Sequence, residues 1–297
     1  MPDPHRQDPA VPDARAAGRL CALATETQRR VEDWSQQFPG LLGQPYIAPV
    51  TSAFAFAYPW CTSGDLLPPL AFELWIFAVD KVIDDDLASA SEVEKFVHQL
   101  TTTATTGAPT GGSVHEHALV NLLDHLAGAD LWPALRQRWL ALFETTFTGM
   151  LTERLDIERI QASATLTFDD YVANSDSCAF RLIRLATWIL SEDQQVLDHL
   201  ETLMTAAWFG QVSSRLTNDL ATCHREHPEH DLNATQITSP AAIRATVRDA
   251  DQRSQDLLGP LLDAAVRPAI GLDRILAFGN GFYETTDFRP ASDSEAR

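Results

Sequence analysis

The stretch from Arg215 to Glu226 carries side chains whose types and spacing could bind a metal ion. Asn218, Thr222 and Glu226 stand four residues apart, so on an α-helix they share one face. An amide oxygen, a hydroxyl and a carboxylate are hard ligands of the kind that Mg²⁺ prefers. Arg215 and Arg225 flank this set, which fits a site that is completed by a polyanion. The alternative interpretation is a solvated helix face with ordinary charge pairs.

A second group of oxygen ligands lies upstream, where an apolar, aromatic helix ends in aspartates. Asp80 and Asp84 share a helix face at i, i+4, and Asp85 and Asp86 follow directly. Like charges at this spacing repel each other, and the helix dipole disfavours carboxylates near a helix C-terminus. A bound cation would offset both costs, so this pattern also indicates a metal site.

The two groups together resemble a class I terpene synthase. In that family an aspartate-rich helix end is followed, well over a hundred residues later, by a motif such as the N-D-x-x-T-x-x-R-E run between Asn218 and Glu226. The resemblance extends from about Phe72 to Arg289 and so covers most of the chain. The downstream motif matches the family pattern at every position.

The upstream motif departs from the family pattern. Where the family usually has D-D-x-x-D, this chain keeps aspartates at the first and fifth positions, Asp80 and Asp84, but has Lys81 at the second. Additional aspartates follow. The sequence therefore leaves open whether Asp84 or Asp85 is the second metal ligand.

The resemblance implies an all-α, single-domain helical bundle that ionises a prenyl diphosphate with the help of three Mg²⁺ ions. The R-L-x-N-D run from Arg215 is similar to the plant-type arrangement, and no D-x-D-D acid motif is present. These features favour a bacterial diterpene synthase of the kaurene-synthase-like type, acting on geranylgeranyl or copalyl diphosphate. A sesquiterpene synthase acting on farnesyl diphosphate is the near alternative.

The same resemblance implies roles for individual residues. The metal ligands would be Asp80, Asp84, Asp85, Asn218, Thr222 and Glu226. The residues that neutralise the diphosphate would be Arg215, Arg225 and Arg289.

Three further residues, Phe77, Trp75 and Arg181, each have more than one interpretation. Phe77 lies one turn before Asp80 and could form part of an aromatic wall that stabilises carbocations, although core packing is the ordinary role of such residues. Trp75 has the same two interpretations. Microbial members of the family carry a diphosphate-sensing arginine upstream of the metal-binding asparagine, but Arg181 does not stand at the usual spacing. We therefore favour Arg215 over Arg181 as a diphosphate ligand.

Composition narrows the remaining classes of function. The 297 residues carry a net charge of −19, which argues against nucleic acids and anionic membranes as partners. The four cysteines show no metal-ligand spacing, and no apolar run reaches membrane-spanning length, so we expect a cytoplasmic protein without membrane insertion. A homodimer is left open. The alternative from a different class is a non-catalytic, acidic helical interaction protein.

The helical pattern divides the chain into a disordered tail over residues 1–17, an α-domain over 18–290 and a C-terminal tail over 291–297. We expect residues 101–112, which are rich in Thr and Gly, to form a loop. The expected helices cover about 20–38, 68–86, 91–101, 114–127, 131–158, 168–190, 193–226 with a break near Gly210, 240–258, and 261–283 with interruptions at Pro268 and Gly271.

Overall fold

The computed structural model describes residues 13–41, 47–87, 89–224 and 231–285. Within these ranges the chain forms helices joined by loops, with no β-strand, so the all-α prediction is confirmed. The α-helices are α1 (Ala14–Ser35), α2 (Ile47–Ala57), α3 (Ser63–Lys81), α4 (Ala90–Thr106), α5 (Val114–Gly128), α6 (Trp132–Gln161), α7 (Phe168–Ala173), α8 (Phe180–Leu190), α9 (Gln195–Thr222), α10 (Pro240–Asp263) and α11 (Arg267–Tyr283).

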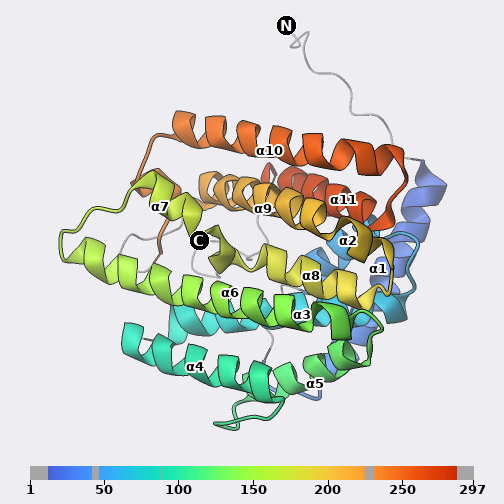
Figure 1. The fold of residues 1–297 in the computed structure, drawn as a ribbon, viewed down its shortest axis with the longest axis horizontal. Coiled ribbons are helices and arrows are strands. Elements are labelled where there is room, and N and C mark those ends of the chain that lie inside the picture. The colour runs from blue at the N-terminus through green and yellow to red at the C-terminus, as the bar shows by residue number, and fades with distance from the viewer. Residues whose placement is uncertain (1–12, 42–46, 88, 225–230, 286–297) are drawn as a thin grey trace, which may run out of the picture.

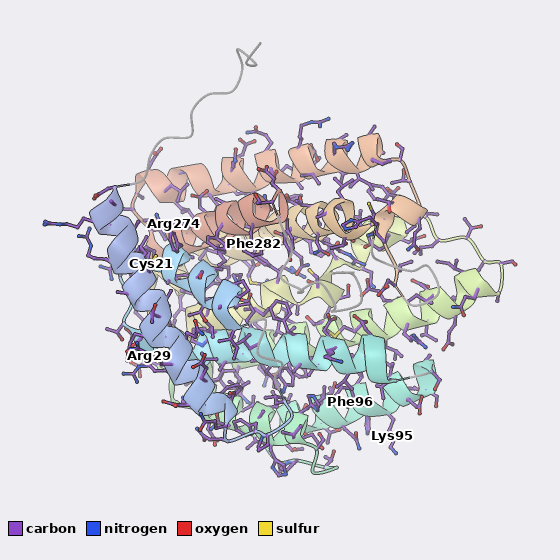
Figure 2. All side chains as sticks on the ribbon, turned by 180° about the vertical axis from the view of Figure 1, so that it is seen from behind. Cys21, Arg29, Lys95, Phe96, Arg274 and Phe282 are labelled. Atoms are coloured by element: carbon purple, nitrogen blue, oxygen red, sulfur yellow. The ribbon has the colours of Figure 1, made fainter. Side chains whose placement is uncertain are left out.

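The helices are stacked in layers, and those that carry the candidate residues lie in the middle (Figure 1). Helix α10 packs along α9, which in turn contacts α8 and α11. Helix α6 lies between α8 and α4, and α3 packs against α1, α5 and α8. On the opposite side of the molecule, α11 is fastened to α2, because Arg274 Nε donates to the carbonyl oxygen of Phe56 at 2.8 Å (Figure 2).

An aromatic cluster fixes α3 against α6. Trp75 is fully buried, its ring stacks on Phe143 with centroids 6.2 Å apart, and Phe143 contacts Phe147 at 4.3 Å. The indole N–H of Trp75 donates to the carbonyl oxygen of His115 at 2.9 Å, so its polar atom is also satisfied. Trp75 is therefore a core residue, and the rigid contact that it makes sets the position of the aspartate-rich end of α3.

Two predicted helix starts are wrong. Helix α1 begins at Ala14, so the last four residues of the predicted tail, 14–17, are helical. Helix α3 begins at Ser63 and not near Pro68. The reason for the earlier start is a capping box, in which the Thr62 hydroxyl accepts from the Asp65 amide and the Asp65 carboxylate accepts from the Thr62 amide.

The expected break of α9 at Gly210 is absent, since α9 continues through this residue. A Cβ atom at position 210 would lie 2.6 Å from both methyl carbons of Leu276 on α11. The glycine therefore serves the close approach of two helices and not a helix end.

The predicted loop over residues 101–112 is wrong in its first half, because α4 runs to Thr106 and ends at Gly107 with φ of 72°. Thr103 is fully buried, and its hydroxyl donates to Glu116 on α5 at 3.2 Å. This tertiary contact outweighs the weak helix propensity of the threonines.

Glu116 is a buried carboxylate whose loss should destabilise the fold. It accepts hydrogen bonds from the amides of Thr110, Gly111 and Ser113, at 2.6, 2.9 and 3.0 Å. Burial alone would raise the pKa of Glu116, but these donors hold it well below its ordinary value. We expect Glu116→Gln to lower the free energy of unfolding by about 2–3 kcal/mol at pH 7, because charge-assisted bonds are lost.

Urea unfolding of both proteins at several pH values checks this prediction. Because the pKa is depressed in the folded state, the stabilisation is present above the unfolded value of about 4.3 and is lost as the pH falls towards the folded value. The difference between wild type and variant should therefore shrink below about pH 4. A difference that is independent of pH would contradict the assignment to the ionised carboxylate.

Candidate active site

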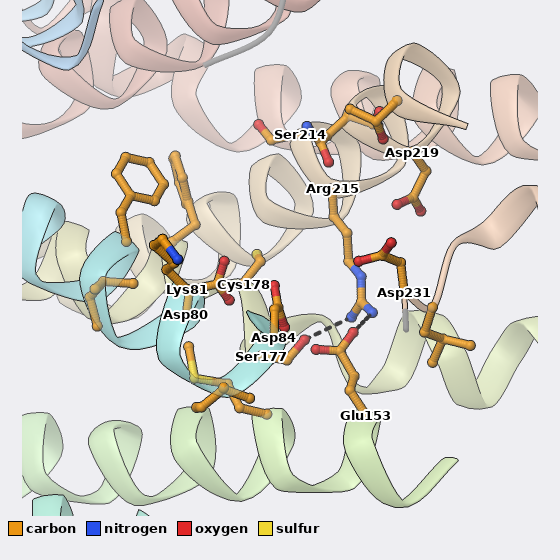
Figure 3. A pocket seen from close by; sticks show the side chains of 18 of the residues that line it. Asp80, Lys81, Asp84, Glu153, Ser177, Cys178, Ser214, Arg215, Asp219 and Asp231 are labelled. Atoms are coloured by element: carbon orange, nitrogen blue, oxygen red, sulfur yellow. Dashed lines mark hydrogen bonds and ion pairs between the residues drawn. The ribbon is translucent and has the colours of Figure 1, made fainter. Parts of the chain in front are cut away.

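A cavity of about 310 Å³ lies between α3, α6, α8 and α9. Its wall contains Asp80 and Asp84 from the aspartate-rich region, together with Asn218 and Thr222 from α9. Figure 3 shows Asp80 and Asp84 on one side of this space and Arg215 entering it from α9. The fold thus brings the two widely separated sequence patterns to the same cavity.

One face of α3 lines the cavity. Between Leu70 and Asp80, the positions that are not buried are Glu73, Phe77 and Asp80, which recur at a spacing of four and three residues. All three border the cavity. Phe77 therefore lies where the sequence placed it, one turn from Asp80 on the same face, and its role as an aromatic wall stays a prediction.

The aspartate-rich end of α3 is not a regular α-helix. Residues Val82–Asp86 form a π-helical turn, closed by a hydrogen bond from the Leu87 amide to the Val82 carbonyl oxygen at 3.1 Å. Such turns widen the helix by one residue and are frequent at functional sites. Asp84 lies within this turn and still borders the cavity. The side chain of Asp85 lies outside the described part of the structure.

On α9, Asn218 and Thr222 occupy successive turns that face the cavity. The Thr222 hydroxyl donates to the carbonyl oxygen of Asn218 at 2.9 Å, which leaves its oxygen lone pairs available as acceptors. Among the hydrogen bonds of the described residues, none involves the side chain of Asn218. Asp219, the next residue, is different, because its carboxylate accepts from the Tyr171 hydroxyl at 2.8 Å. Asp219 thus fastens α9 to α7.

Arg215 is buried, and its guanidinium already has partners. Nη1 donates to the carbonyl oxygen of Asn174 at 2.9 Å and to Ser177 Oγ at 3.0 Å, while Nη2 is paired with Glu153 of α6 (Figure 3). The guanidinium also lies 3.9 Å from the ring centroid of Tyr171. The predicted diphosphate ligand is therefore held within a network that joins α6, α7 and α9.

The charge of Arg215 is secured by this network. Burial would lower its pKa, but the Glu153 carboxylate raises it above the ordinary value. Because the side chain of Arg215 is only 6 % exposed, an anion in the cavity would meet this cation with little water in between.

The expected helix over 168–190 is interrupted. Helix α7 ends at Ala173, a 3-10 turn covers Ser175–Cys178, and Ala179 has φ of 60° before α8 begins. The Asn174 side chain donates to the carbonyl oxygen of Gly149 at 3.0 Å, which pins this segment to α6. Ser177 and Cys178 border the cavity as a result.

Arg181 follows this break and faces another way. It forms a bidentate pair with Asp176, with Nε–Oδ1 at 2.8 Å and Nη2–Oδ2 at 2.5 Å. Its guanidinium carbon lies 4.9 Å from the ring centroid of Trp208. Arg181 does not belong to the cavity wall, whereas Arg215 does.

Arg225, Glu226 and Arg289 lie outside the described residues, so their roles as diphosphate and metal ligands stay predictions.

The sequence patterns missed several polar residues of the cavity wall. They come from α3, α6, α7 and the segment after residue 230, and they are Glu73, Glu153, Tyr171 and Asp231. None belongs to a local motif. Only Glu73 gives a local signal, because it is the one charged residue in the apolar stretch Leu66–Val79.

The donor set of the cavity fits a hard divalent cation. The carboxylates of Asp80 and Asp84 border the same cavity as the amide of Asn218 and the hydroxyl of Thr222, and all four can offer hard oxygen ligands. Within the described residues, no three His, Cys, Asp or Glu side chains meet at one point to form a complete ion site.

Comparison with known proteins agrees with the interpretation of the cavity as a metal-binding site. The family model described as "Terpene synthase family 2, C-terminal metal binding" matches residues 72–239, which is more than half of the chain and includes both cavity motifs. The chain belongs to this terpene synthase family. Its members are lyases that act on prenyl diphosphates, and the matched domain binds a divalent metal. The alternative of a non-catalytic helical protein is thereby set aside.

Individual relatives are distant but cover nearly the whole chain. The chain is 24% identical over 274 residues to an ent-pimara-9(11),15-diene synthase from Streptomyces sp. strain KO-3988, with 90% of this chain and 92% of the relative covered.

Solved structures confirm the class of fold. A linalool/nerolidol synthase from Streptomyces clavuligerus in complex with 2-fluorogeranyl diphosphate matches with a TM-score of 0.71 at 16% identity, covering 88% of this chain and 98% of that chain. A germacradien-4-ol synthase from Streptomyces citricolor matches with a TM-score of 0.72 at 19% identity, covering 89% and 94%. Separately, no helix among the described residues has both the length and the apolar character to cross a bilayer.

Proposed function

We propose that this chain is a Mg²⁺-dependent class I diterpene synthase that ionises a C20 prenyl diphosphate and cyclises the resulting carbocation. The observation that carries the proposal is the pairing of two oxygen-rich helix segments across one cavity, with Arg215 beside them. The rest of the wall includes apolar side chains such as Phe77, Met150 and Ile183. A diphosphate head and a hydrocarbon tail match these two parts.

Each group of residues has a distinct task in this proposal. Asp80, Asp84 and Asn218, with Thr222, would hold the metal between α3 and α9, and bound Mg²⁺ would supply positive charge to the leaving diphosphate. Arg215 adds a fixed cation that needs no reorganisation during bond breaking. Asp85, Arg225, Glu226 and Arg289 are proposed to complete the metal and diphosphate sites.

The C20 substrate is favoured by the relative named ent-pimara-9(11),15-diene synthase, because the alignment with it covers 90% of this chain at 24% identity. The solved structures with the same fold include synthases named for linalool, nerolidol and germacradien-4-ol. Farnesyl diphosphate is therefore the second candidate substrate.

Product analysis by gas chromatography tests the proposal directly. The protein and Mg²⁺ are incubated with farnesyl diphosphate, geranylgeranyl diphosphate and each enantiomer of copalyl diphosphate in separate reactions. We expect a hydrocarbon from a C20 substrate. A product from farnesyl diphosphate alone would replace the diterpene assignment by the sesquiterpene one, and no product from any substrate would contradict the proposal.

Thermal melting with inorganic diphosphate tests the site without turnover. We expect Mg²⁺ and diphosphate together, each at about a hundredfold excess over its dissociation constant, to raise Tm by about 5 °C. Either alone should raise it much less, because each completes the binding site of the other. Equal and additive shifts would show that the two do not share a site.

A further inference from the structure

Glu73 is the carboxylate that lies farthest from the aspartate-rich end on the cavity face of α3. It precedes Asp80 by seven residues, which is two turns and about 10 Å along the helix axis. Phe77 lies between the two on the same face. A substrate whose diphosphate lies at Asp80 and whose chain follows α3 would therefore extend past Phe77 towards Glu73.

The partner of Glu73 is Arg184, which lies outside the cavity wall. Arg184 of α8 donates from Nη2 to Glu73 Oε2 at 2.5 Å and from Nη1 to the Tyr58 hydroxyl at 3.2 Å. Its side chain is 1% exposed, whereas that of Glu73 is 16% exposed. Glu73 borders the cavity and Arg184 does not, so the pair presents its negative member to the substrate space.

One oxygen of Glu73 remains available. Oε2 is taken by Arg184, and among the hydrogen bonds of the described residues none reaches Oε1. The guanidinium of Arg184 also lies over the rings of Phe54 and Phe180, at 5.1 and 5.2 Å from their centroids. Arg184 thus anchors the carboxylate through Oε2, while Glu73 itself borders the cavity.

Burial raises the pKa of Glu73, although Arg184 acts in the opposite direction. A buried ion pair is weak evidence for a role in stability, because its replacement by well-packed apolar side chains is often neutral. A charged pair at the edge of a hydrocarbon cavity is therefore better explained by what its free oxygen can do there.

We propose that Glu73 is the general base that ends the reaction by removing a proton from the cyclised carbocation. This step rests on the proposed function. The C–H bond next to the cationic carbon breaks, its electron pair forms the C=C bond of the product, and the proton passes to Oε1 of Glu73. The neutral carboxylic acid returns the proton to water after the hydrocarbon leaves.

The test separates ionisation from proton removal. Diphosphate release and product composition are measured for wild type, Glu73→Gln and Tyr58→Phe, with the prenyl diphosphate that the wild type converts best. Glutamine keeps the shape and an acceptor for Arg184 but is not basic. We expect Glu73→Gln to release diphosphate within about threefold of wild type, while the share of the main alkene falls at least about tenfold in favour of isomers or alcohols.

Tyr58→Phe is the matched control, because it removes a hydrogen bond from Arg184 without touching the carboxylate. Its product mixture should equal that of wild type. The inference is overturned if Glu73→Gln gives the wild-type mixture, if both variants change it alike, or if diphosphate release falls in step with the product.

A second variant covers the case in which Glu73→Gln does not fold. Glu73→Asp keeps the charge and withdraws the carboxylate by about one bond length. Its mixture of hydrocarbon products should therefore shift towards isomers, and a product mixture equal to that of wild type would overturn the inference. A wild type that releases no diphosphate from any substrate would instead contradict the proposed function.

Discussion

Replacing Asn218 by alanine is expected to lower the rate of diphosphate release by about a thousandfold and to leave the fold intact. The side chain of Asn218 borders the cavity but takes part in no hydrogen bond among the described residues, so its removal leaves no partner unsatisfied. Loss of one preorganised group that acts on the leaving charge costs about 10²–10³ in rate, and loss of a metal ligand lies at the upper end. Diphosphate release at saturating Mg²⁺ measures the effect.

Thr217→Ala is the control for this prediction. Thr217 is the neighbouring residue on α9, it is half-buried, and it does not border the cavity. Its replacement should leave the rate of diphosphate release within about twofold, since Thr217 does not border the cavity that holds the proposed metal ligands. An Asn218→Ala protein with wild-type activity would rule out its role as a metal ligand.

Replacing Arg215 by methionine should have the largest effect on stability. The variant leaves the partly buried Glu153 without its cation, and breaking a buried pair costs about 3–5 kcal/mol, so we expect a loss near the lower end of this range. It also removes the fixed charge that we propose acts on the diphosphate. Urea unfolding and diphosphate release measure these two consequences separately.

The double variant Arg215→Met with Glu153→Leu distinguishes a structural from a catalytic role. Removing both charges relieves the unpaired carboxylate, so at least about half of the lost stability should return. Activity should not return, because the diphosphate still lacks its cation. If the double variant regained activity together with stability, Arg215 would be a structural residue only.

Local patterns were sufficient to predict the helical class of the fold and part of the cavity wall. The helices expected over 114–127 and 131–158 agree within a few residues with α5 and α6, because α5 begins with a Ser113–Glu116 capping box and α6 begins with a proline in its first turn. Spacing alone grouped Asp80 with Asp84 and Asn218 with Thr222, since residues four apart on a helix share a face, and the family resemblance brought the two pairs together.

The features that were missed depend on contacts between distant segments. The interruption before Ala179 carries no Gly or Pro signal, and the hydrogen bond from Asn174 to Gly149 that pins it joins two helices. Thr103 lies in α4, where its hydroxyl donates a hydrogen bond to Glu116 of α5. Glu153 acquires its importance only from Arg215, which lies 62 residues later. Propensity and periodicity describe a single segment, so they contain none of this information.

The π-helical turn over Val82–Asp86 has a consequence for how the aspartates can be presented. A π turn holds one more residue than an α turn, so conversion to regular α-helix would push one residue into the loop beyond Leu87. The side chain of Asp84 would then rotate by about 100° around the helix axis. A cation that binds Asp84 in the π-helical register would therefore stabilise this turn against conversion to regular α-helix.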